Sequence, residues 1–410
     1  MPRVLRLPGS QPVATDAASS SPDEPTSSLV DTSAVDLTEL RKHVRALATL
    51  EASETFVVSC YLSVANGVAR RDVLDRRVRA IRATLTVDER RELDTTMSRL
   101  YAQLEQRSPR TRGIAVFARG GQAPLFRALE FRVPVPDLVC LDRTPVIYPL
   151  VELKDTFHRF VVVISTEASA RILEVSLGAI TRDIWTTAPA LPADVRRQSR
   201  DHYQNHRKDR ADRFLEEKLA LLDRLMSARG HTHLILAGAP RLTARLRDRL
   251  PDRLRAKLVD IVPAPASADH SDVVQAALAS FVEQEQRESL DAADMLCREV
   301  RRGVMAEIGT LPSIEALHRG QADLLVMTGS YDPGRGWICT LCETVTQGPE
   351  RLTDGCSRCG GELAGVDLRE HLVQLAERTG CGFERVSHHD QLSELGGVGC
   401  LLRYARPGRI

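Results

Sequence analysis

The spacing of apolar residues predicts alternating helices and strands over most of the chain. Between residues 36 and 50, positions such as Leu37, Leu40 and Val44 recur every three or four residues, which is typical of a helix with one apolar face. The prolines of 134–153 favour edge strands and a connection over a central strand. Between these two segments, apolar runs predict strands and charged, leucine-punctuated stretches predict helices, at 56–64 (strand), about 72–107 (two helices) and 113–118 (strand).

The pattern changes after residue 156. Three strand-like runs follow one another without a helix, which predicts a β-meander. A polar, strongly charged stretch at 193–210 then leads into a helix with an apolar stripe that includes Phe214, Leu222 and Leu225. The predicted elements are strands at 157–166, 167–180 and 181–187, the helix at 211–228, a strand at 231–238, a short helix through Leu242, Leu246 and Leu250, and a strand at 257–263.

The last part of the chain again alternates helices and strands. A long amphipathic pattern predicts a helix from about 272 to 308, broken near 292–294. A helix at 368–380 ends on a glycine, the usual residue for stopping a helix. Further elements are predicted at 313–320, 323–329, 381–387 and 397–405.

These patterns predict an α/β protein of three consecutive α/β domains. Residues 1–35 are rich in Ser, Pro, Ala and Asp, and we expect a disordered tail there. The predicted domains are an N-terminal α/β domain at 36–154, a middle domain at 155–266 and a C-terminal α/β domain at 270–410, with a cysteine-bearing insertion at 337–361.

Composition narrows the class of protein. The 410 residues carry a formal net charge of only +1, so any contact with nucleic acid must depend on a local basic patch. The sequence shows neither an apolar run of signal-peptide length nor one of about 20 residues that would span a membrane. We therefore expect a cytoplasmic protein without a membrane partner, with reduced thiols and with no evident small-molecule substrate.

Four of the nine cysteines have metal-binding spacing. Cys339 and Cys342 form one C-x-x-C turn, and Cys356 and Cys359 form a second one followed by two glycines. Two such turns facing each other give the tetrahedral sulfur shell that structural zinc prefers. The sequence thus predicts one structural Zn²⁺, in a zinc ribbon whose folding is coupled to metal binding. The alternative is two redox dithiols or four unrelated thiols. The other five cysteines, expected to be small core residues, are Cys60, Cys140, Cys297, Cys381 and Cys400.

Taken together, the order of domains and several motifs resemble the bacterial branch of the archaeo-eukaryotic class-1 release factor and Pelota superfamily. The motifs are GIAVFA and PVPDLVCLDRTPVIYPL in the first domain, FHRFVVVISTEASARILEVSLG, VRRQSRDHYQNHRKDR and HLILAGAPRL in the second, and LPSIEALHRGQADLLVMTG through GVGCLLRY in the third. The resemblance implies an RNase H-like middle domain and a last domain with the fold of kink-turn-binding ribosomal proteins.

The resemblance also places a functional loop. Hydrolytic members use Gly-Gly-Gln, and the matching segment here is Arg196-Arg197-Gln198-Ser199, in which both glycines have become arginines. Arginine lacks the conformational freedom of glycine, so ester cleavage is not expected by this route. A literal Gly120-Gly121-Gln122 follows a strand of the first domain, and we interpret it as a turn.

Codon-reading residues are absent as well. The family's Asn-Ile-Lys-Ser loop does not occur, and its Tyr-x-Cys-x-x-x-Phe motif corresponds here to Leu138, Cys140 and Thr144, of which only the cysteine is retained. The sequence therefore resembles a factor that occupies the ribosome more than one that reads a stop codon.

A local basic patch begins at the same loop. Positive charges beside aromatic rings suit contact with phosphates and unpaired bases. The predicted RNA-binding residues are Arg196, Arg197, Gln198, Arg200, His202, Tyr203, His206, Arg207, Lys208 and Arg210. The alternative is a solvated helix start whose charge is balanced by Asp201, Asp209 and Asp212. Elsewhere, His388-His389-Asp390 is a weak metal candidate, because adjacent histidines point in different directions.

The resulting hypothesis is a ribosome-binding translation factor that occupies the A site in rescue or hibernation without ester cleavage. Its expected partners are the ribosome, with ribosomal RNA or tRNA, and a translational GTPase. One alternative is a peptidyl-tRNA hydrolase that uses Gln198 as its catalytic residue. A second alternative is an RNA-binding protein unrelated to termination.

Overall fold

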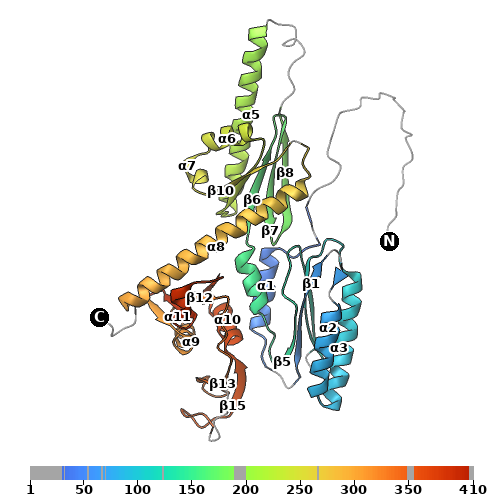
Figure 1. Ribbon diagram of the computed structural model, residues 1–410, viewed down its shortest axis with the longest axis vertical. Coiled ribbons are helices and arrows are strands. Elements are labelled where there is room, and N and C mark those ends of the chain that lie inside the picture. The colour runs from blue at the N-terminus through green and yellow to red at the C-terminus, as the bar shows by residue number, and fades with distance from the viewer. Residues whose placement is uncertain are drawn as a thin grey trace, which may run out of the picture.

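The computed structural model describes residues 30–31, 33–52, 55–65, 68–69, 71–121, 124–188, 200–265, 267–348 and 355–405. These residues form three α/β units, each built on its own sheet, with a long helix running from the second unit to the third (Figure 1). Within the described residues, no helix combines the length and apolar character needed to cross a membrane.

The first unit is an antiparallel sheet with helices on both faces. Its strands are β1 (Val57–Ala65), β2 (Val68–Ala69), β3 (Gly113–Arg119), β4 (Leu125–Phe131) and β5 (Leu138–Asp142), and its helices are α1 (Leu37–Ala48), α2 (Arg71–Thr84), α3 (Val87–Gln106) and α4 (Tyr148–Thr156). Strand β5 pairs with β1 at the edge of the sheet, as the prolines predicted. The last part of segment 134–153 was predicted to be a connection, but it belongs to the helix α4.

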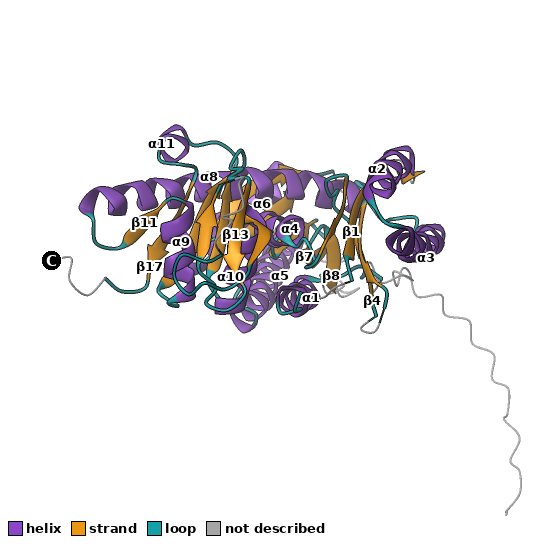
Figure 2. Ribbon diagram, turned by 90° about the horizontal axis from the view of Figure 1, so that it is seen from below, coloured by secondary structure: helices purple, strands orange, loops and turns teal. Residues whose placement is uncertain are grey.

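Alternation along β1 explains the two-sided packing. Cys60 and Leu62 face α2 and α3, where they join a core with Leu74 and Leu100, while Tyr61 packs into a different core on the opposite face. Figure 2 shows α2 and α3 on the outer side of this sheet, and α1 and α4 on the side toward the rest of the molecule.

The middle unit combines a meander with parallel strands. Its elements are β6 (Phe160–Ser165), β7 (Ser169–Ser176), β8 (Ala179–Thr187), α5 (Arg200–Ala228), β9 (Leu234–Gly238), α6 (Pro240–Arg249), α7 (Asp252–Arg255) and β10 (Leu258–Pro263). The strand order is β10-β9-β6-β7-β8, with β9 parallel to both neighbours and β7 antiparallel to both of its own. Helices α5 and α6 cover one face. The predicted β-meander is confirmed, but α5 begins at Arg200, so much of the predicted polar lead-in is helical.

The third unit carries two sheets. Its elements are α8 (His270–Arg302), β11 (Ala306–Ile308), α9 (Thr310–His318), β12 (Ala322–Thr328), β13 (Arg335–Cys339), β14 (Val345–Gln347), β15 (Leu363–Asp367), α10 (Leu368–Thr379), β16 (Gly382–Val386), α11 (Asp390–Glu394) and β17 (Val398–Leu402). The main sheet has the order β11-β17-β12-β16, and the small sheet has the order β14-β13-β15.

Helix α8 differs from its prediction in two ways. It is continuous through residues 292–294, where a break was expected, and it ends at Arg302 with Gly303 in the left-handed conformation. The apolar stripe shifts there because the helix changes partner. Phe281 packs into the core shared with the middle unit, whereas Leu296 packs against the main sheet of the third unit.

The first and third units are joined by buried polar contacts. Glu370 of α10 accepts hydrogen bonds from the backbone N–H groups of Ile147 (2.6 Å) and Tyr148 (3.1 Å), and so satisfies free donors at the start of α4. Desolvation raises the pKa of the Glu370 carboxyl to about 7. Lys154 pairs with Glu377 across the same joint. The predicted domain boundary near residue 154 thus lies inside a helix that packs on both units.

The last residues of the predicted disordered tail are ordered. Arg132 donates to both carboxylate oxygens of Asp31, and the backbone N–H of Asp31 donates to the carbonyl of Ile180 in β8. Both side chains of the ion pair are largely buried. Asp31 therefore ties the start of the described chain to two units, and disorder up to residue 35 is incorrect for this stretch.

Candidate functional site

The four cysteines with metal-binding spacing converge on one point beside the small sheet. Cys339 Sγ lies 3.4 Å from Cys359 Sγ, and Cys342 Sγ lies 3.6 Å from Cys356 Sγ and 3.4 Å from Cys359 Sγ. Four thiolates around one zinc ion at about 2.3 Å would be separated by roughly 3.8 Å. The sulfurs therefore form a ready ligand shell, with contacts that link the first C-x-x-C turn to the second.

Local backbone geometry aims these thiols inward. In each turn a backbone N–H, that of Leu341 or Arg358, donates to the first cysteine's sulfur at 3.4 Å. Hydrogen bonds with Thr344 lower the pKa of the Cys342 thiol to about 6, which favours the thiolate that a metal requires. A Cβ at Gly361 would lie 3.0 Å from Cys339 Sγ, so this position needs glycine for the two turns to close.

Strand β13 anchors the cysteine cluster. Cys339 ends β13, which pairs with β14 and β15 on its two sides. Cys339 and Cys356 are buried, while Leu341 at the tip of the first turn is 75% exposed. Convergence of all four sulfurs rules out four unrelated thiols. The other cysteines behave as predicted, with Cys140 half-buried and Cys60, Cys297, Cys381 and Cys400 buried.

The predicted RNA-binding residues concentrate at one end of α5. Arg196, Arg197 and Gln198 lie outside the described residues, and the chain is described again from Arg200, the first residue of α5. Figure 1 shows this end of α5 extending well beyond the sheet of the middle unit. Arg200, His202, Tyr203 and Arg207 are therefore placed on the projecting part of the helix.

Three members of the predicted set have described side chains. His206 and Lys208 are exposed. Arg210 is partly buried, and its Nη2 donates to the carbonyl of Ala188 at 3.4 Å, just after β8. Arg210 thus anchors the helix to the sheet, while His206 and Lys208 are presented to solvent.

The base of α5 is fixed by a buried lysine that sequence reasoning missed. Lys218 Nζ donates to Ser165 Oγ at 2.9 Å and to the carbonyl of Thr166 at 3.2 Å, and lies over the ring of Phe214. Desolvation lowers the pKa of Lys218 to about 8. These contacts lock the direction in which α5 projects.

Two further segments singled out by the family resemblance, 120–122 and 138–144, belong to the first unit. Gly120 and Gly121 lie between the antiparallel strands β3 and β4, and Gly121 has a positive φ of 72°, which agrees with the predicted turn; Gln122 lies outside the described residues. Leu138 and Cys140 belong to β5, and Thr144 follows it. The Thr144 hydroxyl accepts a hydrogen bond from Gln374 at 3.4 Å, so this segment packs against the third unit.

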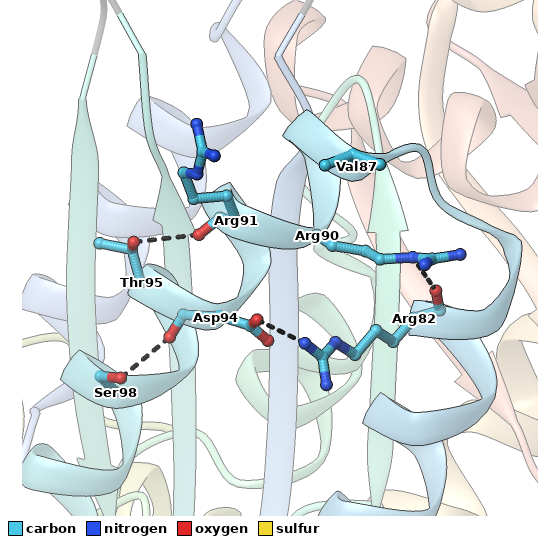
Figure 3. Close-up of a pocket in the computed structure, with 7 residues that line it drawn as sticks. All are labelled: Arg82, Val87, Arg90, Arg91, Asp94, Thr95 and Ser98. Atoms are coloured by element: carbon cyan, nitrogen blue, oxygen red, sulfur yellow. Dashed lines mark hydrogen bonds and ion pairs between the residues drawn. The ribbon is translucent and has the colours of Figure 1, made fainter.

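A surface hollow of about 460 Å³ lies between α2 and α3 (Figure 3). Arg82 Nη2 pairs with Asp94 at 2.8 Å, and Arg90 Nε donates to the carbonyl of Arg82 at 3.0 Å, so these polar groups are satisfied within the hollow. Val87 at its rim is 71% exposed. The lining residues are Arg82, Val87, Arg90, Arg91, Asp94, Thr95 and Ser98, and they show no arrangement of groups poised for catalysis.

The two adjacent histidines have separate partners. His388 Nε2 lies 2.8 Å from Asp390, and both side chains are exposed. His389 caps α11, where its Nδ1 accepts from the Leu392 N–H, and its Nε2 lies 3.2 Å from Asp294. The pair therefore does not converge on one metal position, as the sequence indicated.

A different group of metal-ligating side chains escaped sequence reasoning. His158, His233 and Glu285 place one ligand atom each within 4.8 Å of the others. They come from three segments far apart in the chain, with no spacing that would have linked them.

A family model matches the central part of the chain. Residues 145–281, which span α4, the whole middle unit and the start of α8, match the family model for bacterial archaeo-eukaryotic release factors, family 10. No curated protein matches the sequence significantly.

Solved structures of similar organisation are distant. An archaeal translation termination factor is 16% identical, with a TM-score of 0.25 and coverage of 91% of this chain and 99% of that one. Pelota from Archaeoglobus fulgidus is 13% identical, with a TM-score of 0.37 and coverage of 92% and 94%. A ribosome-bound archaeal Pelota is 11% identical, with a TM-score of 0.39 and coverage of 92% and 96%.

The assignment rests on the family model, whose range includes the loop at Gln198 and all of α5. The resemblance predicted from the sequence motifs is confirmed over residues 145–281, which match the family of bacterial archaeo-eukaryotic release factors.

Proposed function

We propose that this chain is a ribosome-binding translation factor that occupies the A site in rescue or hibernation without cleaving an ester. The observation that carries the proposal is the sequence Arg196-Arg197-Gln198 at the position of the family's Gly-Gly-Gln loop, within the matched segment. Two glycines allow a backbone to approach a peptidyl-tRNA ester closely, whereas two arginines add bulk and positive charge at that point. The loop is therefore suited to holding RNA phosphates and not to placing a water beside an ester.

The length of α5 and the way it packs support the proposal, because its N-terminal half extends away from the middle sheet. A helix of 29 residues is about 43 Å long at 1.5 Å per residue. Its apolar contacts with the sheet come from its second half, through residues such as Leu215, Leu222 and Met226. The first half projects, and carries the basic and aromatic residues predicted to contact RNA. Such a helix would carry its first residue, Arg200, far from the body of the molecule.

The finer assignments of fold belong to the same proposal. The middle unit would be RNase H-like, which its mixed sheet order β10-β9-β6-β7-β8 supports. The third unit would share the fold of kink-turn-binding ribosomal proteins, and its cysteine cluster would be a zinc ribbon that presents a surface to ribosomal RNA or a partner factor. By analogy with relatives of this type, a translational GTPase would deliver the protein to the ribosome.

The second candidate is peptidyl-tRNA hydrolysis, favoured by the retention of Gln198 itself. In that case Gln198 would orient the attacking water, and neighbouring arginines would neutralise the developing oxyanion. An RNA-binding role unrelated to termination ranks third, because it leaves the family match without an explanation.

Co-sedimentation of the protein with ribosomes from growing and starved cells tests the leading proposal. We expect the protein in the ribosomal fraction in at least one state, with binding weakened by salt because it depends on phosphate contacts. Neutralising His206 and Lys208 to alanine should weaken the association, while a matched change at Glu216 and Glu217 on the same helix should not. Absence from ribosomes in both states would refute the proposal.

Peptidyl-tRNA release separates the first two candidates. Purified protein is incubated with ribosomes that carry peptidyl-tRNA, and free peptide is measured. The non-hydrolytic proposal predicts no release above background. Release that disappears in a Gln198→Ala variant would establish the hydrolase instead.

A further inference from the structure

The cluster of His158, His233 and Glu285 lies where the middle unit meets α8. His158 follows α4, His233 directly precedes β9, and Glu285 is on α8. Figure 1 shows α8 crossing the molecule diagonally from the middle unit to the third unit. The cluster therefore sits at the point where the long helix leaves the middle sheet.

The distances suit a metal ion. His158 Nδ1 lies 3.2 Å from Glu285 Oε2, and His233 Nε2 lies 3.4 Å from Glu285 Oε1. Ligands bound to zinc at about 2.0–2.2 Å are separated by roughly 3.3–3.6 Å in a tetrahedral arrangement. The carboxylate is thus placed between the two imidazoles at the spacing of ligands around one ion.

The packing of the rings fixes their directions. Phe281 meets the edges of both imidazoles, with ring centroids 5.2 Å from His158 and 5.3 Å from His233, and stacks on Phe160 at 4.5 Å. This apolar floor holds two imidazoles side by side and excludes water from one side of the cluster. Ligands whose directions are fixed by packing are what a protein metal site requires.

One ligand atom lacks a hydrogen-bond partner. The Glu285 side chain is only 12% exposed, and its buried Oε1 accepts no hydrogen bond from the described residues. A buried carboxylate oxygen without a donor is costly, and an ion placed between it and the imidazoles would satisfy it.

Several other carboxylates lie close to Glu285. Desolvation and the nearby carboxylates of Glu288, Asp155 and Glu384 raise the pKa of Glu285 to about 9. A divalent cation bound here would offset part of this negative charge.

We propose that His158, His233 and Glu285 bind a divalent transition metal, in a second metal site that fastens α8 to the middle unit. Two imidazoles and one carboxylate form a ligand set that suits zinc. A remaining position is within reach of Glu288, whose Oε1 lies 3.0 Å from His233 Nε2, or of water. The simpler alternative is a hydrogen-bonded cluster in which Glu285 shares protons with the two histidines. The inference does not depend on the ribosomal role.

Metal content of the purified full chain decides between the two. We expect two zinc ions per chain, one in the cysteine ribbon and one at the junction. His233→Asn and Glu285→Gln should each reduce the content to one, while Glu283→Gln, an exposed glutamate on the same helix, should leave it at two. One zinc per chain in the unaltered protein, unchanged by His233→Asn, would overturn the proposal in favour of the hydrogen-bonded cluster.

Cobalt provides a readout that distinguishes the sites without relying on a variant that folds poorly. Cobalt bound by four thiolates gives intense charge-transfer absorption, whereas cobalt bound by imidazole and carboxylate gives only weak d–d bands. Titrating the metal-free full chain with Co²⁺ should saturate the charge-transfer signal at one equivalent and continue to change the d–d region up to a second. Saturation of all bands at one equivalent would refute the second site.

Discussion

The two ligand clusters of this molecule are built in opposite ways. The cysteine cluster comes from two tight turns within one short segment, and its backbone hydrogen bonds are almost all local. The cluster of His158, His233 and Glu285 is assembled by packing among segments more than fifty residues apart, over the buried ring of Phe281. The geometry of the first cluster is set by local turns, whereas that of the second depends on the global fold.

The largest effect is expected from removing the aromatic ring on which the second cluster packs. Phe281→Ala deletes a fully buried ring and should lower the free energy of unfolding by about 3–5 kcal/mol. Chemical denaturation measures the change, and cobalt charge-transfer absorption should show the cysteine ribbon still loaded. Leu290→Ala, at a partly exposed position of the same helix, should cost under about 0.5 kcal/mol. Loss of the ribbon metal in the Phe281 variant would mean that the two clusters are not independent.

Removing a ligand from the cysteine cluster should have a strong effect that is confined to its surroundings. Cys356→Ser removes one ligand of the ribbon and should weaken metal binding by about 100-fold or more. Hydrogen–deuterium exchange should then show lost protection in β13, β14 and β15, with the helices of the three units still protected. Equal loss of protection in α8 would contradict a locally built cluster.

The joint between the first and third units should respond to pH. The pKa of Glu370 is about 7 in the folded protein against an ordinary value of 4.5, so the folded state holds this proton more tightly than the unfolded chain does. Its contribution to stability is complete below about pH 4.5 and is lost as the pH rises to about 7.

Comparing denaturation curves at pH 5 and 8 for the unaltered protein and Glu370→Gln checks this. Between pH 5 and 8 the free energy of unfolding of the unaltered protein should fall by an amount on the order of 1–3 kcal/mol, and this fall should be absent in the variant. Glu394→Gln, at an exposed position, should keep the decline. Zinc binding by thiolates has the opposite dependence and weakens in acid, so the ribbon and the joint should respond in opposite directions.

The smallest expected effect concerns the closure of the ribbon. Gly361→Ala brings a methyl group to 3.0 Å from Cys339 Sγ and should reduce metal affinity by about 10-fold. Gly365→Ala on β15 meets only ordinary contacts, at 3.5 Å from the Trp337 ring, and should leave the affinity unchanged. Competition with a chelator measures both. Equal effects of the two substitutions would indicate that the turns tolerate a wider approach.

The same contrast explains what could be predicted from the sequence. Local signals were sufficient to predict the clustering of the four cysteines, the β-meander of 157–187 and the glycine stop of α10. The start of α5 was missed because its first residues carry no apolar stripe, since they extend past the sheet. The predicted break in α8 arose from an apolar stripe that changes direction as the helix passes from one sheet to another.

Contacts between residues that are distant in the chain could not be predicted from the spacing of residues. His158 and His233 look like isolated histidines in the sequence, and Glu285 is one of several glutamates on a charged helix. Glu370 and Lys218 likewise gain their roles only from partners far away in the chain. The RNA-binding set stays a prediction, because its central residues Arg196, Arg197 and Gln198 lie outside the described part of the chain.

The unbroken helix α8 also sets a mechanical property of the molecule. At 33 residues it is about 50 Å long at 1.5 Å per residue. One part packs against the middle sheet and the other against the third unit, so displacing either unit would bend a continuous hydrogen-bonded rod. The continuous helix therefore limits how far the middle unit, with the projecting end of α5, can move relative to the third unit, which carries the cysteine cluster.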